Sequence, residues 1–183
     1  MNIIQAPSPN FFGRSGYNSE LLVIHCTDGN WDTDKEWLRT PASQVSAHFV
    51  ISPDGGVYQL VAVENAAWHA GRVNNPTAKL KKNATGGFIN PNFYAIGVEV
   101  SLKSTAVMPQ LQNDALVQLV KFLTSKYKIP IDRDHIVGHR EIYSLKRCPG
   151  TIDVEALVQA VTPPHNTNEK IKAQIIALVK KIK

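Results

Sequence analysis

Eight side chains of this 183-residue chain are natural ligands for a transition metal: His25, His48, His69, His135, His139, His165, Cys26 and Cys148. Zinc prefers nitrogen and sulfur ligands, and catalytic zinc sites use three protein ligands and leave the fourth position open. His25 and His139 each follow a short apolar run and precede polar residues, so both are expected at strand ends. With Cys148 they would make a catalytic zinc set, but spacing alone does not select them over His48 or His69.

The two cysteines occupy different surroundings. Cys26 lies inside the apolar run 21–26, where a buried and inert thiol is expected. Cys148 lies in the polar segment 146–150, where a free cysteine more often has a chemical function. A disulfide between them is not expected, because the N-terminus lacks the features of a signal peptide and the chain is expected to fold in the cytoplasm.

A single acid interrupts an apolar strand. Glu99 lies within residues 96–100 and shares a strand face with Gly97. A buried carboxylate costs free energy unless it is paired or opens into a cleft. Glu99 is therefore either an edge-strand acid that points to solvent or a general base that takes a proton from an attacking water. Lys146 is either a surface lysine or a cation that stabilises a developing oxyanion.

Alternating strands and helices must position these residues. Apolar runs predict strands, and helical periodicity predicts amphipathic helices. In chain order we expect an irregular lead-in (1–19), a strand (21–26), a helix (32–39) and a β-hairpin (48–61). A long surface loop (70–94), a strand (95–101) and two helices (110–128 and 153–161) follow. This order predicts one α/β domain with a central mixed β-sheet flanked by helices.

The net charge of +5 is concentrated at one end of the chain. Residues 165–183 contain five lysines and one glutamate, whereas residues 1–164 contain 15 basic and 14 acidic residues. A nearly neutral domain argues against nucleic acid as a partner. No apolar run reaches the ~20 residues that cross a bilayer, so no membrane span is expected.

Composition divides the chain into three parts. Residues 1–162 are expected to form the catalytic domain, and residues 163–168, which begin with two prolines, a linker. Residues 169–183 combine apolar residues at helical spacing with lysines on the other faces, which predicts a basic amphipathic helical tail. This helix can dock on the domain, self-associate or lead to a further domain.

Five segments occur in the order found in a known family: VIHCT at 23–27, VSAHFVI at 45–51, AWHAG at 67–71, IGVE at 96–99, and GHREI followed by KRCPG within 138–150. Through them the chain resembles the type 2 N-acetylmuramoyl-L-alanine amidases, which include many phage endolysins and the peptidoglycan recognition proteins. The resemblance covers residues 20–160. It implies a zinc hydrolase that cleaves the amide between N-acetylmuramic acid and L-alanine in bacterial peptidoglycan.

The resemblance also assigns roles to residues. The family's metal ligands map onto His25, His139 and Cys148, which implies one bound Zn²⁺. Its catalytic carboxylate maps onto Glu99, and its transition-state lysine maps onto Lys146.

Four further positions complete this comparison. His48 and His69 are interpreted as substrate-binding or supporting residues rather than ligands, and Trp68 as a wall of the substrate groove or a core tryptophan. One branch of the family has a tyrosine before the hairpin histidine. This chain has Ala47 there, so more of the proton transfer is expected to fall on Glu99.

Three biological roles fit these residues. The first is a phage or prophage endolysin, made in the cytoplasm without a signal peptide and acting on the cell wall after release. The second is a cytosolic amidase of wall recycling, although such members commonly carry an aspartate where this chain has Cys148. The third is a non-catalytic peptidoglycan-binding module, which typically lacks the cysteine. Cys148 therefore favours the endolysin.

Overall fold

A six-stranded sheet forms the centre of the computed structural model, which describes residues 1–164 and 175. In spatial order its strands are β1 (Ile3–Gln5), β5 (Val57–Gln59), β4 (Phe49–Ile51), β7 (Ala95–Val100), β3 (Leu21–Cys26) and β8 (Ile136–Gly138). Neighbouring strands are parallel except β4 and β5, which form the predicted hairpin. The prediction of a mixed central sheet is confirmed.

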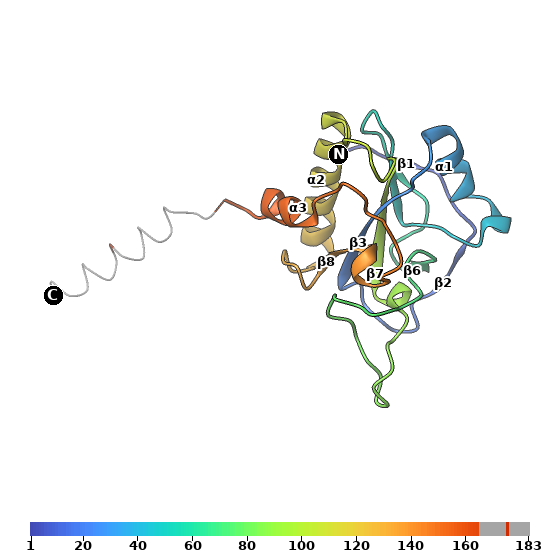
Figure 1. Ribbon diagram of the computed structural model, residues 1–183, viewed down its shortest axis with the longest axis vertical. Coiled ribbons are helices and arrows are strands. Elements are labelled where there is room, and N and C mark those ends of the chain that lie inside the picture. The colour runs from blue at the N-terminus through green and yellow to red at the C-terminus, as the bar shows by residue number, and fades with distance from the viewer. Residues whose placement is uncertain (165–174, 176–183) are drawn as a thin grey trace.

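Helices flank this sheet on both sides (Figure 1). The long helix α2 (Gln110–Tyr127) and α3 (Val154–Val161) share the main hydrophobic core with one face of the sheet. Helix α1 (Trp31–Trp37) lies on the other side, where Leu38 packs with Val50 of β4. Three short 3-10 helices complete the helical elements of the described residues: η1 (Pro41–Ser43), η2 (Pro91–Phe93) and η3 (His139–Glu141).

Strand alternation separates core side chains from polar ones. Ile24 of β3 and Val98 of β7 lie in the main core with α2 and α3, so the neighbouring His25 and Glu99 point to the opposite face. Strands β3, β4, β7 and β8 are parallel to their partners in this half of the sheet, and their carboxyl ends meet at one edge. Ligand sites of open α/β sheets lie at such edges.

The N-terminal lead-in is more ordered than predicted. Within residues 1–19, β1 pairs with β5, and β2 (Phe11–Gly13) pairs with β6 (Asn65–Ala67) in a separate two-stranded sheet. Each of these strands has only three residues, too few for an alternation pattern to be recognised. Their pairing depends on partners about 50 residues away, so local sequence does not reveal it.

Residues 71–90 form most of the predicted surface segment, part of which projects from the body of the molecule (Figure 1), whereas its end at 91–94 contains η2 and is largely buried. The proposed linker at 163–168 and tail at 169–183 lie outside the described residues, apart from positions 163, 164 and 175. The division at residue 162 and the tail helix therefore stay predictions. Among the described residues, every helix is too short or too polar to cross a membrane.

Candidate metal centre and adjoining cleft

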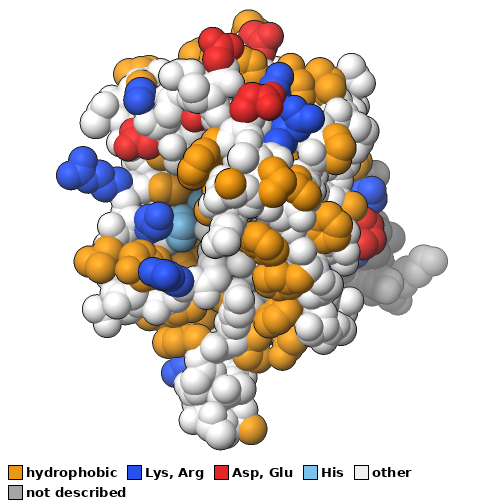
Figure 2. Space-filling view, turned by 90° about the vertical axis from the view of Figure 1, so that its right-hand side faces the viewer, with side chains coloured by type: hydrophobic (Ala, Val, Ile, Leu, Met, Phe, Trp, Pro, Cys, Tyr) orange, Lys and Arg blue, Asp and Glu red, His pale blue; other side chains and the backbone are white. Residues whose placement is uncertain are grey.

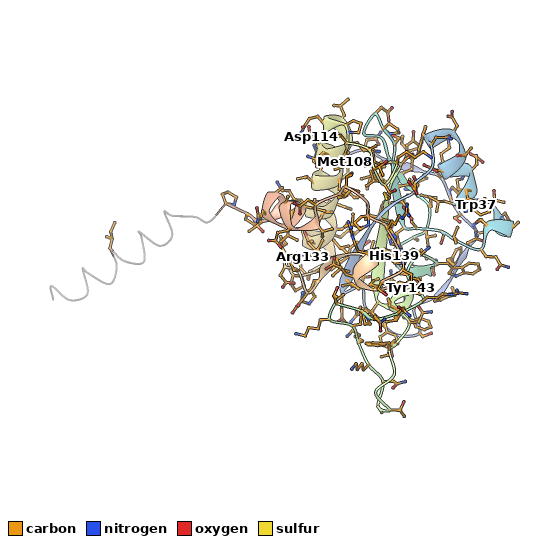
Figure 3. The ribbon with its side chains drawn as sticks, in the orientation of Figure 1. Trp37, Met108, Asp114, Arg133, His139 and Tyr143 are labelled. Carbon is orange, nitrogen blue, oxygen red and sulfur yellow. The ribbon has the colours of Figure 1, made fainter. Side chains whose placement is uncertain are left out.

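Three candidate ligands converge at the carboxyl edge of the sheet. His25 lies near the end of β3, His139 follows β8 directly and begins η3, and Cys148 lies in the loop before α3. One donor atom from each lies within 4.8 Å of the others. Cys148 Sγ is 3.5 Å from His25 Nδ1, and the ring centroids of His25 and His139 are 4.6 Å apart. Figure 3 labels His139. Parallel pairing of β3 with β8 produces this convergence.

The protonation states of these groups suit a metal. Burial lowers the pKa of His139 to about 4 and holds the pKa of His25 well below its ordinary value, so both imidazoles are neutral and have a free lone pair. A hydrogen bond with Cys26, together with burial, raises the pKa of the Cys148 thiol. A bound cation would reverse that effect, because coordination deprotonates a thiol. Two neutral nitrogens and one sulfur are a donor set that zinc prefers.

Glu99 stands beside this cluster. In the pairing of β3 with β7 it lies opposite His25, and its Oε1 is 3.8 Å from His25 Nδ1. Burial raises the pKa of Glu99 to about 8. Its Oε2 is buried and has no hydrogen-bond partner within residues 1–164. A buried carboxylate in this state lacks a positive partner, so the site fits a cation. Because β7 lies between β4 and β3, the edge-strand interpretation of Glu99 is wrong.

A cavity of about 210 Å³ opens over the cluster and is lined by the three donors, Glu99 and Lys146. A second cavity of about 420 Å³ shares Lys146 and His139 with the first, so the two form one groove. Figure 2 shows this hollow, with histidine at its floor and Lys or Arg side chains beside it. The groove leads from the candidate metal site to the surface.

The other predicted site residues divide into two groups. Trp68 and His69 line both cavities, and Lys146 is an exposed residue of the groove wall. His48 has no exposed surface and does not line either cavity. The expectation that His48 contacts substrate is therefore corrected. His48 instead accepts a hydrogen bond from the Gly97 N–H at 3.0 Å and supports β7 from within.

Two residues of the cleft were missed in the sequence. Asp34, in α1, is buried at the cavity wall, where it accepts hydrogen bonds from the hydroxyls of Thr27 (2.6 Å) and Ser101 (2.7 Å). Trp37 is 59% exposed and also lines the cavity. An acid in the first turn of a helix is normally explained by the helix dipole, so only the tertiary contacts identify Asp34.

Arg14 is a third unexpected residue, although it lies outside the cleft. It is buried, and its guanidinium donates to the carbonyl oxygens of Val63, Phe93 and Ala95 at 2.6 to 3.0 Å. Burial lowers its pKa to about 10. Arg14 thereby ties the N-terminal lead-in to the start of β7, the strand that carries Glu99.

Comparison with known proteins agrees with this geometry. The fold and donor cluster define a mixed α/β domain with a candidate metal site at the carboxyl edge of its sheet. Residues 15–151 match the family described as N-acetylmuramoyl-L-alanine amidase. This match covers well over half of the sequence, and the chain belongs to that family.

Individual relatives show the same similarity. N-acetylmuramoyl-L-alanine amidase A of Achromobacter lyticus is 30% identical over 95 residues, which are 51% of this chain and 43% of that protein. The 1,6-anhydro-N-acetylmuramyl-L-alanine amidase AmpD of Salmonella typhimurium is 30% identical over 157 residues, covering 75% of this chain and 78% of that protein. The chain thus spans less than half of the first relative.

A solved structure shares the fold. It is the amidase AmiD from E. coli in complex with the substrate anhydro-N-acetylmuramic acid-L-Ala-D-gamma-Glu-L-Lys. The similarity has a TM-score of 0.64 at 24% identity and covers 80% of this chain and 59% of that one.

Proposed function

We propose that this protein is a zinc-dependent peptidoglycan hydrolase that cleaves the amide bond between N-acetylmuramic acid and L-alanine. The observation that carries the proposal is the convergence of His25, His139 and Cys148 beside the buried Glu99 at the floor of an open groove. Family membership supplies the class of bond. The three donors would hold one Zn²⁺.

Each residue around the donors has a distinct task in this reaction. Zinc, when bound, supplies a Lewis acid that polarises the amide carbonyl and lowers the pKa of water. Glu99 accepts a proton from the attacking water at Oε1, the oxygen that faces His25, and returns it to the leaving L-alanine nitrogen. Lys146 stabilises the negative charge that develops on the carbonyl oxygen. Ala47 carries no hydroxyl, so more of the proton transfer falls on Glu99.

The groove suits an acidic peptide. The substrate seen with AmiD continues from L-alanine to a γ-linked D-glutamate, and a γ-link leaves the α-carboxylate free. Arg72 and Lys146 line the groove, and neither forms an ion pair with any side chain in the described part of the chain. We assign Arg72 to the free α-carboxylate of the peptide, while Lys146 keeps its task at the carbonyl oxygen. Trp68 and the exposed Trp37 offer flat apolar faces for the sugar or the peptide.

Two cellular roles remain within this proposal. We favour an endolysin that acts on the bacterial wall after release, because Cys148 matches the ligand of that branch. Similarity to the Salmonella AmpD enzyme supports the second candidate, an amidase of wall recycling. An endolysin should act faster on intact wall than on soluble 1,6-anhydro-muropeptides, and the opposite ratio would identify a recycling enzyme.

Clearing of cell walls tests the proposed function. Purified protein should reduce the turbidity of a suspension of Gram-positive walls, a zinc chelator should stop the reaction, and added Zn²⁺ should restore it. Clearing that survives complete removal of zinc would overturn the proposal. Binding to walls without clearing would identify a peptidoglycan-binding module instead. Self-association through the tail stays a separate prediction.

A further inference from the structure

His69 lies directly against the candidate metal ligand His25. Its Nδ1 is 3.1 Å from His25 Nε2, and the two rings are nearly perpendicular, at 87° with centroids 5.2 Å apart. His69 packs on the backbone of β7 at Gly97, where a Cβ would lie only 2.6 Å from its Cγ. Glycine at this position therefore lets the imidazole ring approach β7 closely enough to reach His25.

The contacts of His25 determine which of its nitrogens faces the cluster. Nδ1 lies 3.5 Å from Cys148 Sγ and 3.8 Å from Glu99 Oε1, whereas Nε2 faces His69. A neutral imidazole carries one N–H and one lone pair. If the Nδ1 of His25 has a free lone pair toward the cluster, the single ring proton of His25 lies on Nε2. The His25 Nε2–H can form a hydrogen bond with His69 only if the Nδ1 of His69 carries no proton.

We propose that His69 is a positioning residue: its Nδ1 accepts the hydrogen bond from His25 Nε2–H and so fixes the tautomer and ring orientation in which His25 Nδ1 binds zinc. Metal-bound histidines generally donate their second N–H to such a partner, and loss of the partner typically costs 10- to 100-fold in affinity. This inference rests on the metal site of the proposed function. It gives His69 a role other than the expected substrate contact.

His48 does not share this role. Its Nδ1 accepts the N–H of Gly97 at 3.0 Å, and its Nε2 lies 2.9 Å from Arg14 Nη2 and 3.0 Å from the Asn65 carbonyl oxygen. Both nitrogens of His48 therefore face groups other than the candidate ligands. His69 is the described histidine whose hydrogen bond reaches a candidate ligand.

Substitutions that keep or remove the acceptor test the proposal. Asparagine can place its Oδ1 near the position of His69 Nδ1, whereas leucine has similar bulk and no acceptor. His69→Leu should weaken zinc binding 10- to 100-fold in a chelator competition assay, and His69→Asn should retain most of the affinity. Activity of His69→Leu should recover at high Zn²⁺, which loss of a catalytic group would not permit. His135→Leu is the matched control, because His135 bonds Asp132 away from the cleft.

A measurement on the unmodified protein complements these variants. Long-range ¹H–¹⁵N NMR spectra of the zinc-loaded protein should show His25 with its proton on Nε2 and zinc on Nδ1, and His69 neutral with its proton on Nε2. A proton on His25 Nδ1, wild-type zinc affinity in His69→Leu, or equal losses in the Leu and Asn variants would each overturn the inference. The zinc-affinity and NMR measurements contain no substrate, so failure to cleave peptidoglycan would count against the proposed function alone.

Discussion

Replacing Glu99 by glutamine should remove catalysis while leaving the metal site intact. Glutamine has the same shape, but its amide cannot take a proton from water. Glu99 Oε1 is 3.8 Å from His25 Nδ1, and Glu99 is outside the donor set of His25, His139 and Cys148. General base catalysis contributes about 10²- to 10⁴-fold, equivalent to about 3–5 kcal/mol at 1.36 kcal/mol per factor of ten. Glu99→Gln should lose that much in kcat/KM.

The assay is the rate of release of L-alanine amino groups from purified peptidoglycan, measured together with bound zinc per protein. Glu20→Gln is the control, because Glu20 is paired with Lys81 elsewhere on the surface. Glu99→Gln protein that contains zinc and retains more than about a tenth of the wild-type rate would refute the assignment of Glu99 as the base. Loss of zinc together with activity would also refute it, by making Glu99 a ligand.

Three further changes have defined outcomes. Cys148→Ala should lose zinc as well as activity, and a variant that still binds one zinc tightly would remove Cys148 from the ligand set. Arg72→Ala should raise KM about two- to fivefold for peptides with a free α-carboxylate, with a smaller effect at high salt; an unchanged KM would contradict its role. Burial, beside the Arg14 guanidinium, lowers the pKa of His48 to about 3, so the unfolded state binds a proton below pH 6.5 that the native state does not. Urea titrations should show that the free energy of unfolding falls as the pH is lowered from 6 to 4. The slope should be about 1.4 kcal/mol per pH unit steeper than in His48→Gln, and equal slopes would contradict this prediction.

Local patterns in the sequence were sufficient for the elements that carry the site. The apolar runs around His25 and Glu99 predicted β3 and β7, and alternation placed Glu99 on the face of Gly97, as the structure shows. The hairpin and the three helices predicted within residues 1–162 are also present, with small differences at their ends. These features depend on residues near one another in the chain, so periodicity reveals them.

Contacts between distant segments were not available from such patterns. The order of the strands decides that His25 lies opposite Glu99, and no local signal encodes that register. Arg14 bonds carbonyl groups 49 or more residues away, and Asp34 bonds Ser101 across the fold. The choice of His25 and His139 as candidate ligands came from the family resemblance, because the spacing of the histidines along the chain does not distinguish these two from His48 or His69.

Chemical analysis of digested peptidoglycan tests the central claim most directly. The zinc-loaded protein should release new amino groups that belong only to L-alanine, without new reducing sugars, and the release should stop on zinc removal and resume when Zn²⁺ is restored. New reducing ends, amino groups on any other residue, or cleavage that does not depend on zinc would contradict a zinc amidase whose groove lies at the carboxyl edge of the sheet.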